Sequence, residues 1–316
     1  MKQVDSNKPI TNQVVYATIG AFDGVHLGHQ QLIRSMVIQA KNDSAKSAVI
    51  TFHPHPAVLL RSIPMPFYIT SPTEKSQLFY ELGVDYVVTL TFDSEMASLS
   101  PEQFIDLLLH QLPIKKIWLG KDFALGKNRA GNLSVLKEIG KIKGFSIVEC
   151  QHLENEGEKI SSSKIRNWIQ SGDFRQTFKA LNRFYSIEGV IAHGDSRGKQ
   201  IGYPTANLDV WNGKLLPGSG VYATWIEVNN IIYPSVTNVG VRPTFENQNK
   251  PPRIETYIFH FDQDIYQNQV KLYFVEKIRP EFKFSSVDQL ITQIQSDVKQ
   301  TEEILKNVTK PTGLFT

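Results

Sequence analysis

Two histidines inside a glycine-rich segment are the first residues of this sequence whose types and spacing suggest chemistry. An apolar run ends at Ile19, and Gly20–His29 then reads Gly-Ala-Phe-Asp-Gly-Val-His-Leu-Gly-His. Glycines let a backbone turn tightly and approach a ligand, and a helix that starts at such a turn offers unpaired N–H groups to an anion. Because His26 and His29 are three residues apart, both rings can face one phosphate and stabilise charge that develops on phosphorus. The segment therefore predicts a phosphate site.

Metal binding is the alternative interpretation of these histidines. Two histidines are a weak basis for a metal site, and the neighbouring sequence holds no obvious third ligand. His53 and His55 follow the next apolar run, in Thr-Phe-His-Pro-His-Pro, and would complete a zinc cluster. The prolines beside them favour instead a rigid wall for a ligand. Asp23, inside the turn, fits a turn-forming role slightly better than a mechanistic one.

A second group of phosphate-binding candidates lies much later in the chain. Ile160–Arg166 reads Ile-Ser-Ser-Ser-Lys-Ile-Arg. The serine hydroxyls and the N-terminus of a following helix can donate to phosphate, and Arg166 adds a permanent charge with forked geometry. The serines alone also fit an ordinary N-cap for a helix over Lys164–Gln170. The two roles are compatible, and the segment taken alone leaves both interpretations open.

The candidates for a second site lie in Gly194–Leu208, which reads Gly-Asp-Ser-Arg-Gly-Lys-Gln-Ile-Gly-Tyr-Pro-Thr-Ala-Asn-Leu. Its Gly-Lys pair is one residue short of the Walker A spacing, and Gln200 stands where that motif needs Ser or Thr. We therefore reject a P-loop. A glycine-rich flap over phosphates remains, with Arg197 and Lys199 as charge partners. Pro204–Asn207 by itself also fits an ordinary turn.

The elements that must position the first group alternate between strands and helices. The apolar runs predict strands over Val14–Ile19, Ala48–Phe52, Tyr86–Leu90, Ile117–Leu119 and Phe145–Val148. Helical periodicity predicts helices over His29–Ala40, Thr73–Leu82, Pro101–Gln111 and Leu133–Ile142. This alternation indicates a parallel sheet with helices on both faces. Ligands then bind at the carboxyl ends of the strands.

The sequence changes character after about Arg183. Short runs of β-branched and aromatic residues, separated by turn residues, predict strands over Ile187–Ile191, Gly220–Val228, Ile231–Val236, Ile254–Phe261 and Val270–Val275. They indicate an antiparallel barrel or sandwich, and a helix from Val287 closes the chain. We therefore predict two domains of different class, residues 1–183 and residues 184–316.

Composition limits the class of protein. The chain has 316 residues, of which 41% are hydrophobic and 21% charged, as in ordinary globular proteins. The net charge of +3 is too small to indicate a nucleic-acid surface but suits local phosphate binding. One cysteine, Cys150, excludes an internal disulfide and follows an apolar run, which favours a buried structural thiol. A polar N-terminal segment and the lack of a long apolar window lead us to expect a cytoplasmic protein without a membrane span.

The motifs of the first half resemble the adenylyltransferase domain of the prokaryotic bifunctional riboflavin kinase/FAD synthetase family. His-Leu-Gly-His is similar to the HxGH signature of nucleotidyltransferases, and Thr-Phe-His-Pro-His-Pro, Gly120–Phe123 and the serine motif complete the pattern. The resemblance implies a Rossmann-like domain in which His26, His29 and Arg166 are catalytic. The implied ATP contacts are Gly20, Phe22, Gly28, Ser162 and Ser163. The implied flavin contacts are Pro54, Pro56, Asp122 and Phe123.

The second half resembles riboflavin kinases, through Pro-Thr-Ala-Asn at 204–207, Gly-Val-Tyr-Ala at 220–223 and Ile-Arg-Pro-Glu-Phe-Lys-Phe at 278–284. The resemblance implies an antiparallel β-barrel kinase domain with a C-terminal helix. In it Thr205 and Asn207 would hold Mg²⁺. Glu255 would accept the proton of the ribityl hydroxyl, and the alternative is a solvent-facing strand glutamate. The remaining implied contacts are Gly194, Arg197 and Lys199 with ATP and Arg279 with flavin.

The resemblance as a whole predicts an enzyme that phosphorylates riboflavin to FMN and adenylylates FMN to FAD. ATP would be the co-substrate and Mg²⁺ the cofactor, with small molecules rather than nucleic acid or membrane as partners and a monomer or weak homo-oligomer as the assembly. Some positions depart from the family pattern: Asn182 and Gln267 replace glycines, Phe184 a proline and Leu125 an aromatic residue. Two alternatives therefore stay open, a diverged copy with one activity and a flavin- or nucleotide-binding regulator.

Overall fold

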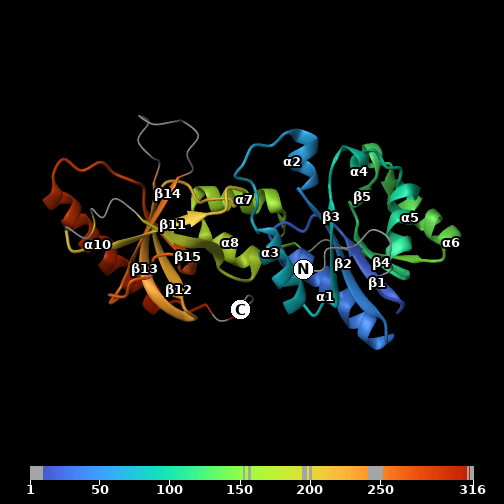
Figure 1. The fold of residues 1–316 in the computed structure, drawn as a ribbon, viewed down its shortest axis with the longest axis horizontal. Helices are drawn as coiled ribbons and strands as arrows, with labels where there is room; N and C mark the ends of the chain where they lie inside the picture. Colours follow the sequence, from blue (N-terminus) through green and yellow to red (C-terminus); the bar gives the residue numbers. More distant parts are fainter. Residues whose placement is uncertain are drawn as a thin grey trace. The chain divides into compact units, whose positions relative to one another are not determined.

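The computed structural model describes residues 10–151, 154–155, 158–193, 198, 201–240, 252–311 and 313. The chain divides into two compact units, Met1–Ile160 and Ser161–Thr316, which run from blue to green and from yellow-green to red in Figure 1. This division comes earlier than the boundary that we expect at residue 183. The reason is that helix α8 (Phe174–Leu181) packs against the barrel strands of the second unit, and α7 (Ser162–Ser171) packs against α8.

The first unit alternates strands and helices along its length. Its strands are β1 (Val15–Ile19), β2 (Lys46–His53), β3 (Tyr86–Thr91), β4 (Ile114–Gly120), β5 (Ala124–Leu125), β6 (Gly131–Asn132), β7 (Ser146–Cys150), β8 (Glu154–Asn155) and β9 (Glu158–Lys159). Its helices are α1 (Leu27–Asn42), α2 (Pro56–Arg61), α3 (Pro72–Glu81), α4 (Ser94–Ser98), α5 (Pro101–Gln111), the short 3-10 turn η1 (Lys127–Arg129) and α6 (Leu133–Lys143).

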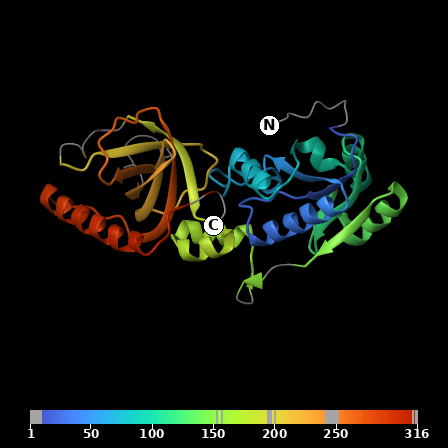
Figure 2. The ribbon, with the colours of Figure 1, turned by 90° about the horizontal axis from the view of Figure 1, so that it is seen from below.

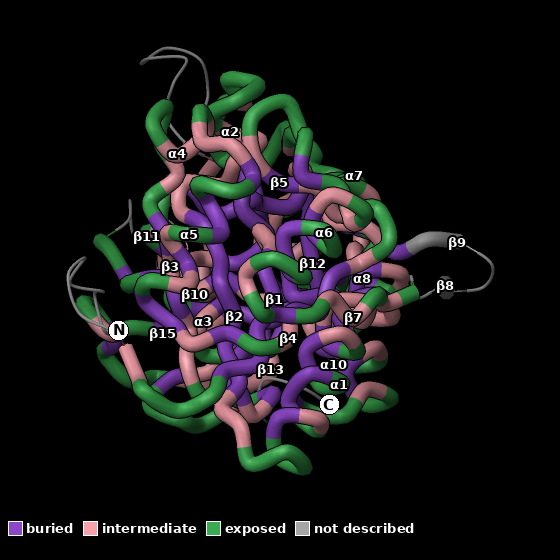
Figure 3. Tube along the Cα trace, turned by 90° about the vertical axis from the view of Figure 1, so that its right-hand side faces the viewer, coloured by how far each residue is buried: buried purple, intermediate pink, exposed green. Residues whose placement is uncertain are grey.

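A parallel sheet of five strands, in the order β3-β2-β1-β4-β7, forms the centre of this unit. Successive side chains of a strand point to opposite faces, and Val15, Ala17 and Ile19 pack with α5 and α6 in one core cluster. Helices α1 and α3 lie on the other face (Figure 1). Because helices cover both faces, every residue of β1 is buried (Figure 3).

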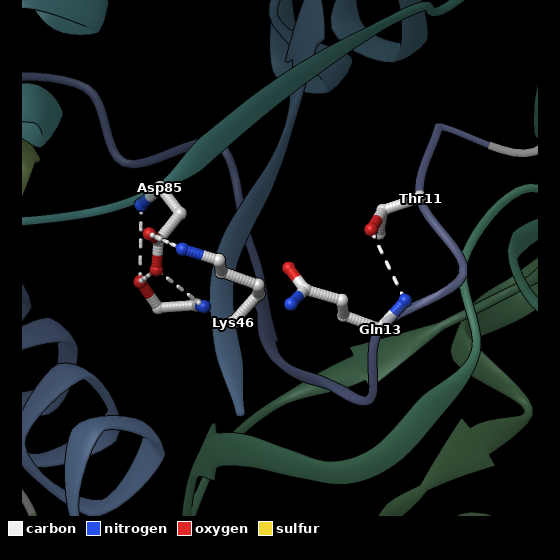
Figure 4. Close-up of polar contacts among 5 residues, drawn as sticks. Thr11, Gln13, Lys46 and Asp85 are labelled. Atoms are coloured by element: carbon white, nitrogen blue, oxygen red, sulfur yellow. Dashed lines mark hydrogen bonds and ion pairs between the residues drawn. The ribbon is translucent and has the colours of Figure 1, made fainter. Parts of the chain in front are cut away.

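A carboxylate joins the amino ends of β2 and β3. Asp85 Oδ1 accepts a hydrogen bond from Lys46 Nζ at 3.0 Å, and Asp85 Oδ2 accepts from Ser47 N at 2.9 Å and Ser47 Oγ at 2.8 Å (Figure 4). The Ser47 hydroxyl in turn accepts from the Asp85 N–H at 3.0 Å. These bonds hold the parallel register of β2 and β3 at their amino ends. Ligands in folds of this class bind at the opposite end, outside the carboxyl ends of the strands.

The second unit combines α7 and α8 with a closed antiparallel barrel in the order β10-β11-β14-β13-β12-β15. Pairing of β10 with β15 closes the barrel. The strands are β10 (Tyr185–Ala192), β11 (Thr205–Val210), β12 (Gly220–Val228), β13 (Ile231–Gly240), β14 (Arg253–Ile258) and β15 (Gln269–Arg279).

The C-terminal helix α10 (Val287–Lys306) lies along the outside of the barrel (Figure 2). Ser286 caps its N-terminus by accepting from Gln289 N. Leu305 packs in a cluster with Trp225 and Tyr273, and Val298 packs against a second cluster that includes Val221. The helix therefore covers β12, β13 and β15 with its apolar side.

The predicted fold class is confirmed, with a parallel sheet followed by an antiparallel barrel. The plain alternative for Pro204–Asn207, a turn, is wrong from Thr205 onward, because that residue begins β11 and pairs with Tyr257 of β14. The strand predicted over Ile254–Phe261 ends at Ile258, because His260 has a φ of 54° and turns the chain. Helix α8 was not predicted at all.

Candidate active sites in the two units

The segment from Gly20 to His26 forms the turn between β1 and α1. The Gly20 N–H donates to Ile50 O at 3.0 Å, so the hydrogen bonding between β1 and β2 continues into the first residue of the turn. A Cβ at Gly20 would lie 2.8 Å from Cζ of Phe22, so the missing side chain makes room for that ring. Phe22 and Val25 have φ values of 48° and 40°, a left-handed conformation that bulky residues rarely adopt. Such strain is concentrated at functional sites.

The two histidine rings of the turn are stacked on each other. The ring centroids of His26 and His29 are 3.6 Å apart with an interplanar angle of 20°. Phe22 meets the His29 ring edge-on at 5.1 Å, so Phe22 supports the imidazole from the core. Among the described residues, Nδ1 of His29 is buried and has no hydrogen-bond partner. A buried polar atom of this kind needs a partner, which a ligand or an ordered water can supply.

The environment of His29 decides its charge. Burial is the largest cause that holds its pKa well below the usual value, and the nearby His26 and Lys75 lower the pKa further. The ring is therefore neutral near pH 7. A neutral imidazole can act toward a phosphate as an N–H donor but not as a cation.

Asp23 holds the turn rather than facing the chemistry. Its carboxylate is buried and accepts from Ile69 N at 3.2 Å, from Thr70 N at 3.1 Å and from Thr70 Oγ1 at 3.3 Å. The Gly24 N–H donates to the same Thr70 hydroxyl at 3.1 Å. Asp23 thus ties the turn to the segment that leads into α3.

The His53–Pro56 segment follows β2. His55 caps α2, because its Nδ1 accepts from Ala57 N at 3.0 Å, and its own N–H donates to the Tyr68 hydroxyl at 2.9 Å. Pro54 follows a cis peptide bond, and Pro56 begins α2. Burial, and then Lys75, lower the pKa of His53. Within the described part of the chain, no group of three or more His, Cys, Asp or Glu side chains is arranged to hold a metal ion.

The residues expected to contact flavin next to β4 divide into two kinds. Asp122 is exposed, and its carbonyl accepts from Arg129 Nη2 at 3.0 Å. Phe123 is half-buried against the core cluster of the sheet. Because β1, β2 and β4 are parallel, the segments that follow them lie at one edge of the sheet. The histidine turn, His53–Pro56 and Asp122 therefore share that edge.

The serine motif begins α7. Ser161 is the N-cap and accepts from Lys164 N at 3.4 Å, so the capping role is present. Ser162, Ser163 and Arg166 follow in the first two turns of the helix. Since α7 belongs to the second unit, the joint action of this motif and the histidine turn stays a prediction.

A cavity of about 380 Å³ in the second unit brings together four of the residues predicted for the second site, and its size suits a small-molecule ligand. The predicted residues that line it are Thr205, Asn207, Glu255 and Arg279. Asn207 of β11 and Asn238 of β13 flank Glu255 of β14 in register. Asn207 Oδ1 is buried and has no hydrogen-bond partner in the described part of the chain. This orphaned oxygen, together with the Thr205 hydroxyl, fits the oxygen ligands that Mg²⁺ prefers.

Two further residues of this cavity were missed by sequence reasoning. Arg253 Nη1 lies 3.1 Å from Glu255 Oε1, so the predicted base is held by an ion pair on its own strand. The Asp297 carboxylate of α10 accepts hydrogen bonds from Arg279 Nε at 2.9 Å and from Arg279 Nη2 at 2.7 Å. The same carboxylate accepts from Gln293 Nε2 at 2.9 Å. Arg253 lies two residues before Glu255 on β14, so the alternation of side chains along a strand could have placed both on one face. No feature of the sequence indicates the contact between α10 and β15.

Arg279 is therefore oriented by Asp297 within the cavity wall. Its guanidinium carbon lies 5.1 Å from the ring centre of Phe282 and 5.8 Å from that of Phe284. The Asp297 side chain is only 4% exposed, so the ion pair is largely withdrawn from water. Gly194, Arg197 and Lys199 lie outside the described residues.

Comparison with known proteins identifies the family. Residues 8–164 match the FAD synthetase family, and residues 181–305 match the riboflavin kinase family. A bifunctional riboflavin kinase/FMN adenylyltransferase of Bacillus subtilis is 37% identical over 92% of this chain and 93% of that protein. The chain belongs to the bifunctional riboflavin kinase/FMN adenylyltransferase family. An Escherichia coli K12 protein of the same name is 33% identical over 93% of each chain.

A solved structure shares the fold of this riboflavin kinase/FMN adenylyltransferase family member. A Streptococcus pneumoniae chain described as a macrolide-efflux protein is 32% identical, with a TM-score of 0.85, over 95% of this chain and 96% of that one. Efflux is said of that protein alone. None of the helices in the described ranges here is long and apolar enough to cross a membrane.

Cys150 is the last residue of β7 and pairs in register with Gly120 of β4, and its carbonyl accepts from Lys121 N at 3.2 Å. Its side chain is half-buried, and burial raises the pKa of its thiol. A raised pKa disfavours the thiolate, so the expectation of a structural rather than nucleophilic cysteine is supported.

Proposed function

We propose that this chain makes FMN and FAD at two separate sites, with the barrel cavity phosphorylating riboflavin and the sheet edge of the first unit adenylylating FMN. The proposal rests above all on the cavity, where Asn207, Glu255 and Asn238 stand in one row across three strands. Each reaction has its own candidate residues and its own matching family segment. Because both reactions consume ATP, we also propose that the protein works in the cytoplasm.

In the kinase reaction the nucleophile is an alcohol, which reacts poorly until a base accepts its proton. Glu255 is the base that we propose. Its carboxylate takes the ribityl proton, the ribityl oxygen bonds to the γ-phosphorus of ATP, and ADP leaves. Arg253 at 3.1 Å orients the carboxylate toward this task. Arg279, fixed by Asp297, binds flavin at the cavity wall.

Thr205 and Asn207 are the residues that we propose for Mg²⁺. Their hydroxyl and amide oxygens suit this hard cation, and the buried Asn207 Oδ1 has no protein partner among the described residues. When bound, Mg²⁺ neutralises charge on the phosphate oxygens of ATP. We propose that Gly194, Arg197 and Lys199 contact ATP from the flap before β11.

The adenylyl transfer needs no protein base. The FMN phosphate has a second pKa near 6, as do other phosphomonoesters, so it is anionic at pH 7. Its oxygen bonds to the α-phosphorus of ATP, and pyrophosphate leaves. The protein must align the two substrates and stabilise the charge of the transition state. We propose that His26 and His29 perform the second task, with His29 as a neutral N–H donor, because burial holds its pKa low.

The remaining residues of this site are proposed as binding contacts. Gly20, Phe22 and Gly28 shape the turn that receives ATP. Ser162, Ser163 and Arg166 hold its phosphates from the start of α7. Pro54, Pro56, Asp122 and Phe123 bind the flavin at the same sheet edge.

A product assay tests the proposal. The full-length chain, incubated with riboflavin, ATP and MgCl₂, is expected to form FMN first and FAD later, as separated by liquid chromatography. FAD should also form directly when FMN replaces riboflavin. FMN without FAD would instead select the single-activity alternative, and the absence of both products with oxidised and reduced flavin would contradict the enzyme assignment.

A further inference from the structure

The first unit contains a buried lysine that neither reaction as described above uses. Lys75 is only 7% exposed and belongs to the first turn and a half of α3. The N-terminus of α3 is closed by a capping box between Ser71 and Glu74. A cation near the N-terminus of a helix faces the positive end of the helix dipole, and burial of a charge is costly. The position of Lys75 therefore needs an explanation beyond packing.

The contacts of Lys75 join the two loops that carry the predicted site residues. Its Nζ donates to Ala21 O at 3.0 Å and to Thr51 Oγ1 at 2.9 Å. The Thr51 hydroxyl donates to the same Ala21 oxygen at 3.2 Å. Ala21 lies in the turn that leads to His26, and Thr51 lies two residues before His53 on β2. One ammonium group thus holds the turn after β1 against the end of β2.

The ammonium of Lys75 keeps capacity for a further bond. A lysine ammonium has three N–H donors. Two of them have acceptors, Ala21 O and Thr51 Oγ1, and no acceptor for the third is found in the described part of the chain. The group is also close enough to His29 and His53 for its charge to lower the pKa of both.

We propose that Lys75 is a positioning residue for adenylyl transfer, which fixes the Ala21 carbonyl of the histidine turn and places a buried positive charge behind the phosphate site. This inference rests on the proposed function of the first unit. Burial is the main cause of the lowered pKa values of His29 and His53, and the charge of Lys75 adds to it, which favours both rings as neutral donors rather than cations. It also stabilises the negative charge that grows on the transferred phosphoryl group.

The protonation of Lys75 gives the proposal a pH signature. The groups that face it include Asp23 of the turn, His29 of α1 and His53 of β2. Burial lowers the pKa of Lys75 to about 8, and the carboxylate of Asp23 opposes that change. Lys75 is therefore charged below pH 8 and loses its charge as the pH rises through that value. FAD formation by the wild-type chain should decline over the same range.

The experiment compares Lys75→Met and Lys75→Gln with Lys46→Met in the full-length chain. Lys46→Met is the matched control, because it also removes a lysine charge, at the amino end of β2, where Lys46 pairs with Asp85 (Figure 4). In the Lys75 variants kcat for FAD formation from FMN should fall about tenfold or more, with a smaller change in KM for FMN. The decline near pH 8 should disappear, and the pKa values of His29 and His53, measured by NMR, should rise. Lys46→Met should match the wild type.

Riboflavin phosphorylation provides the second control, because the second unit performs it. A Lys75 variant with normal FMN formation, normal kcat for FAD and an unchanged pH profile would overturn the inference. If Lys75→Met fails to fold, Lys75→Gln decides, since it keeps a donor and loses only the charge; wild-type rates in that variant also overturn the inference. A wild-type chain that forms no FAD from FMN would contradict the proposed function itself, which is a distinct outcome.

Discussion

Asn207 and Glu255 stand opposite each other on the neighbouring antiparallel strands β11 and β14, in the wall of one cavity. Asn238 flanks Glu255 on the other side, on β13. Cross-strand neighbours lie about 5 Å apart at their Cβ atoms. The amide that we assign to Mg²⁺ and the carboxylate that we assign to proton transfer are therefore placed for a single phosphoryl transfer.

Replacement of Glu255 by glutamine should remove the base and keep the shape of the side chain. We expect FMN formation from riboflavin to slow about 100-fold or more, which is the usual contribution of a general base. FAD formation from added FMN should be unchanged. Chromatography of the products from each substrate measures both rates. Glu276→Gln is the matched control, because Glu276 is an exposed glutamate on the same barrel. Equal loss of both activities would contradict the division into two sites.

Replacement of His29 by alanine should have the opposite effect. It removes an N–H donor and the ring that stacks on His26 at 3.6 Å. We expect FAD formation to fall about 100-fold, the usual loss when one donor to a developing charge is removed. FMN formation should be preserved, since His29 is a residue of the first unit. His110→Ala, at an exposed position in the last turn of α5, should leave both rates unchanged.

Replacement of Asp297 by alanine should damage the barrel cavity without touching the base. The change leaves the Arg279 guanidinium, whose side chain is 13% exposed, without its bidentate partner. Loss of one member of a buried ion pair costs about 3 kcal/mol in the free energy of unfolding. The KM for riboflavin should rise more than kcat falls. Urea unfolding and steady-state kinetics measure the two effects.

A surface ion pair supplies the comparison for Asp297. Lys141 and Glu138 pair at 2.7 Å with side chains that are 72% and 66% exposed. Glu138→Gln should change the free energy of unfolding by less than about 0.5 kcal/mol. A loss in Asp297→Ala no larger than in this variant would show that the Arg279 pair does not support the cavity.

The stability of the first unit should depend on pH through Lys75. The folded-state pKa of about 8 lies below the ordinary value of 10.5, so between these values the unfolded chain binds more protons. The free energy of unfolding therefore rises as the pH increases from 8 toward 10.5. Lys75→Met should lose this rise. Pulse proteolysis in urea, with peptides of β1 to β4 quantified by mass spectrometry, measures the free energy of unfolding of the first unit directly. An equal change of the free energy of unfolding with pH in wild type and variant would contradict the lowered pKa of Lys75.

Local sequence carries much of the fold because periodicity and capping act over a few residues. Pro101–Gln111 is both the predicted helix and α5, and the structure shows the capping box of Ser100 and Gln103 at its start. Gly220–Val228 is likewise both the predicted strand and β12. In contrast, Thr205–Val210 carries turn residues, and only pairing with β10 and β14 makes it a strand. Strand formation there depends on residues far away in the chain.

Two departures from the family pattern are also explained by backbone conformation. Asn182, at a position where the resemblance expects glycine, ends α8 with a φ of 53°. Asparagine visits this left-handed region more readily than most residues. Gln267 adopts a φ of 65° in the turn before β15. Neither residue lies in a predicted site, so these departures alone do not favour a loss of activity.

The sequence by itself determined the two fold classes and the family to which its motifs belong, because motifs and periodicity are local properties. Phosphate binding at the histidine turn stays a prediction from the sequence. Only the tertiary structure decided the charge state of His29, the turn-holding role of Asp23 and the partners of Glu255 and Arg279. It also decided the burial of Lys75, which in the sequence is one lysine of an ordinary helix. Burial and long-range contacts set the pKa values and orientations of these groups, and both arise only when distant segments pack together.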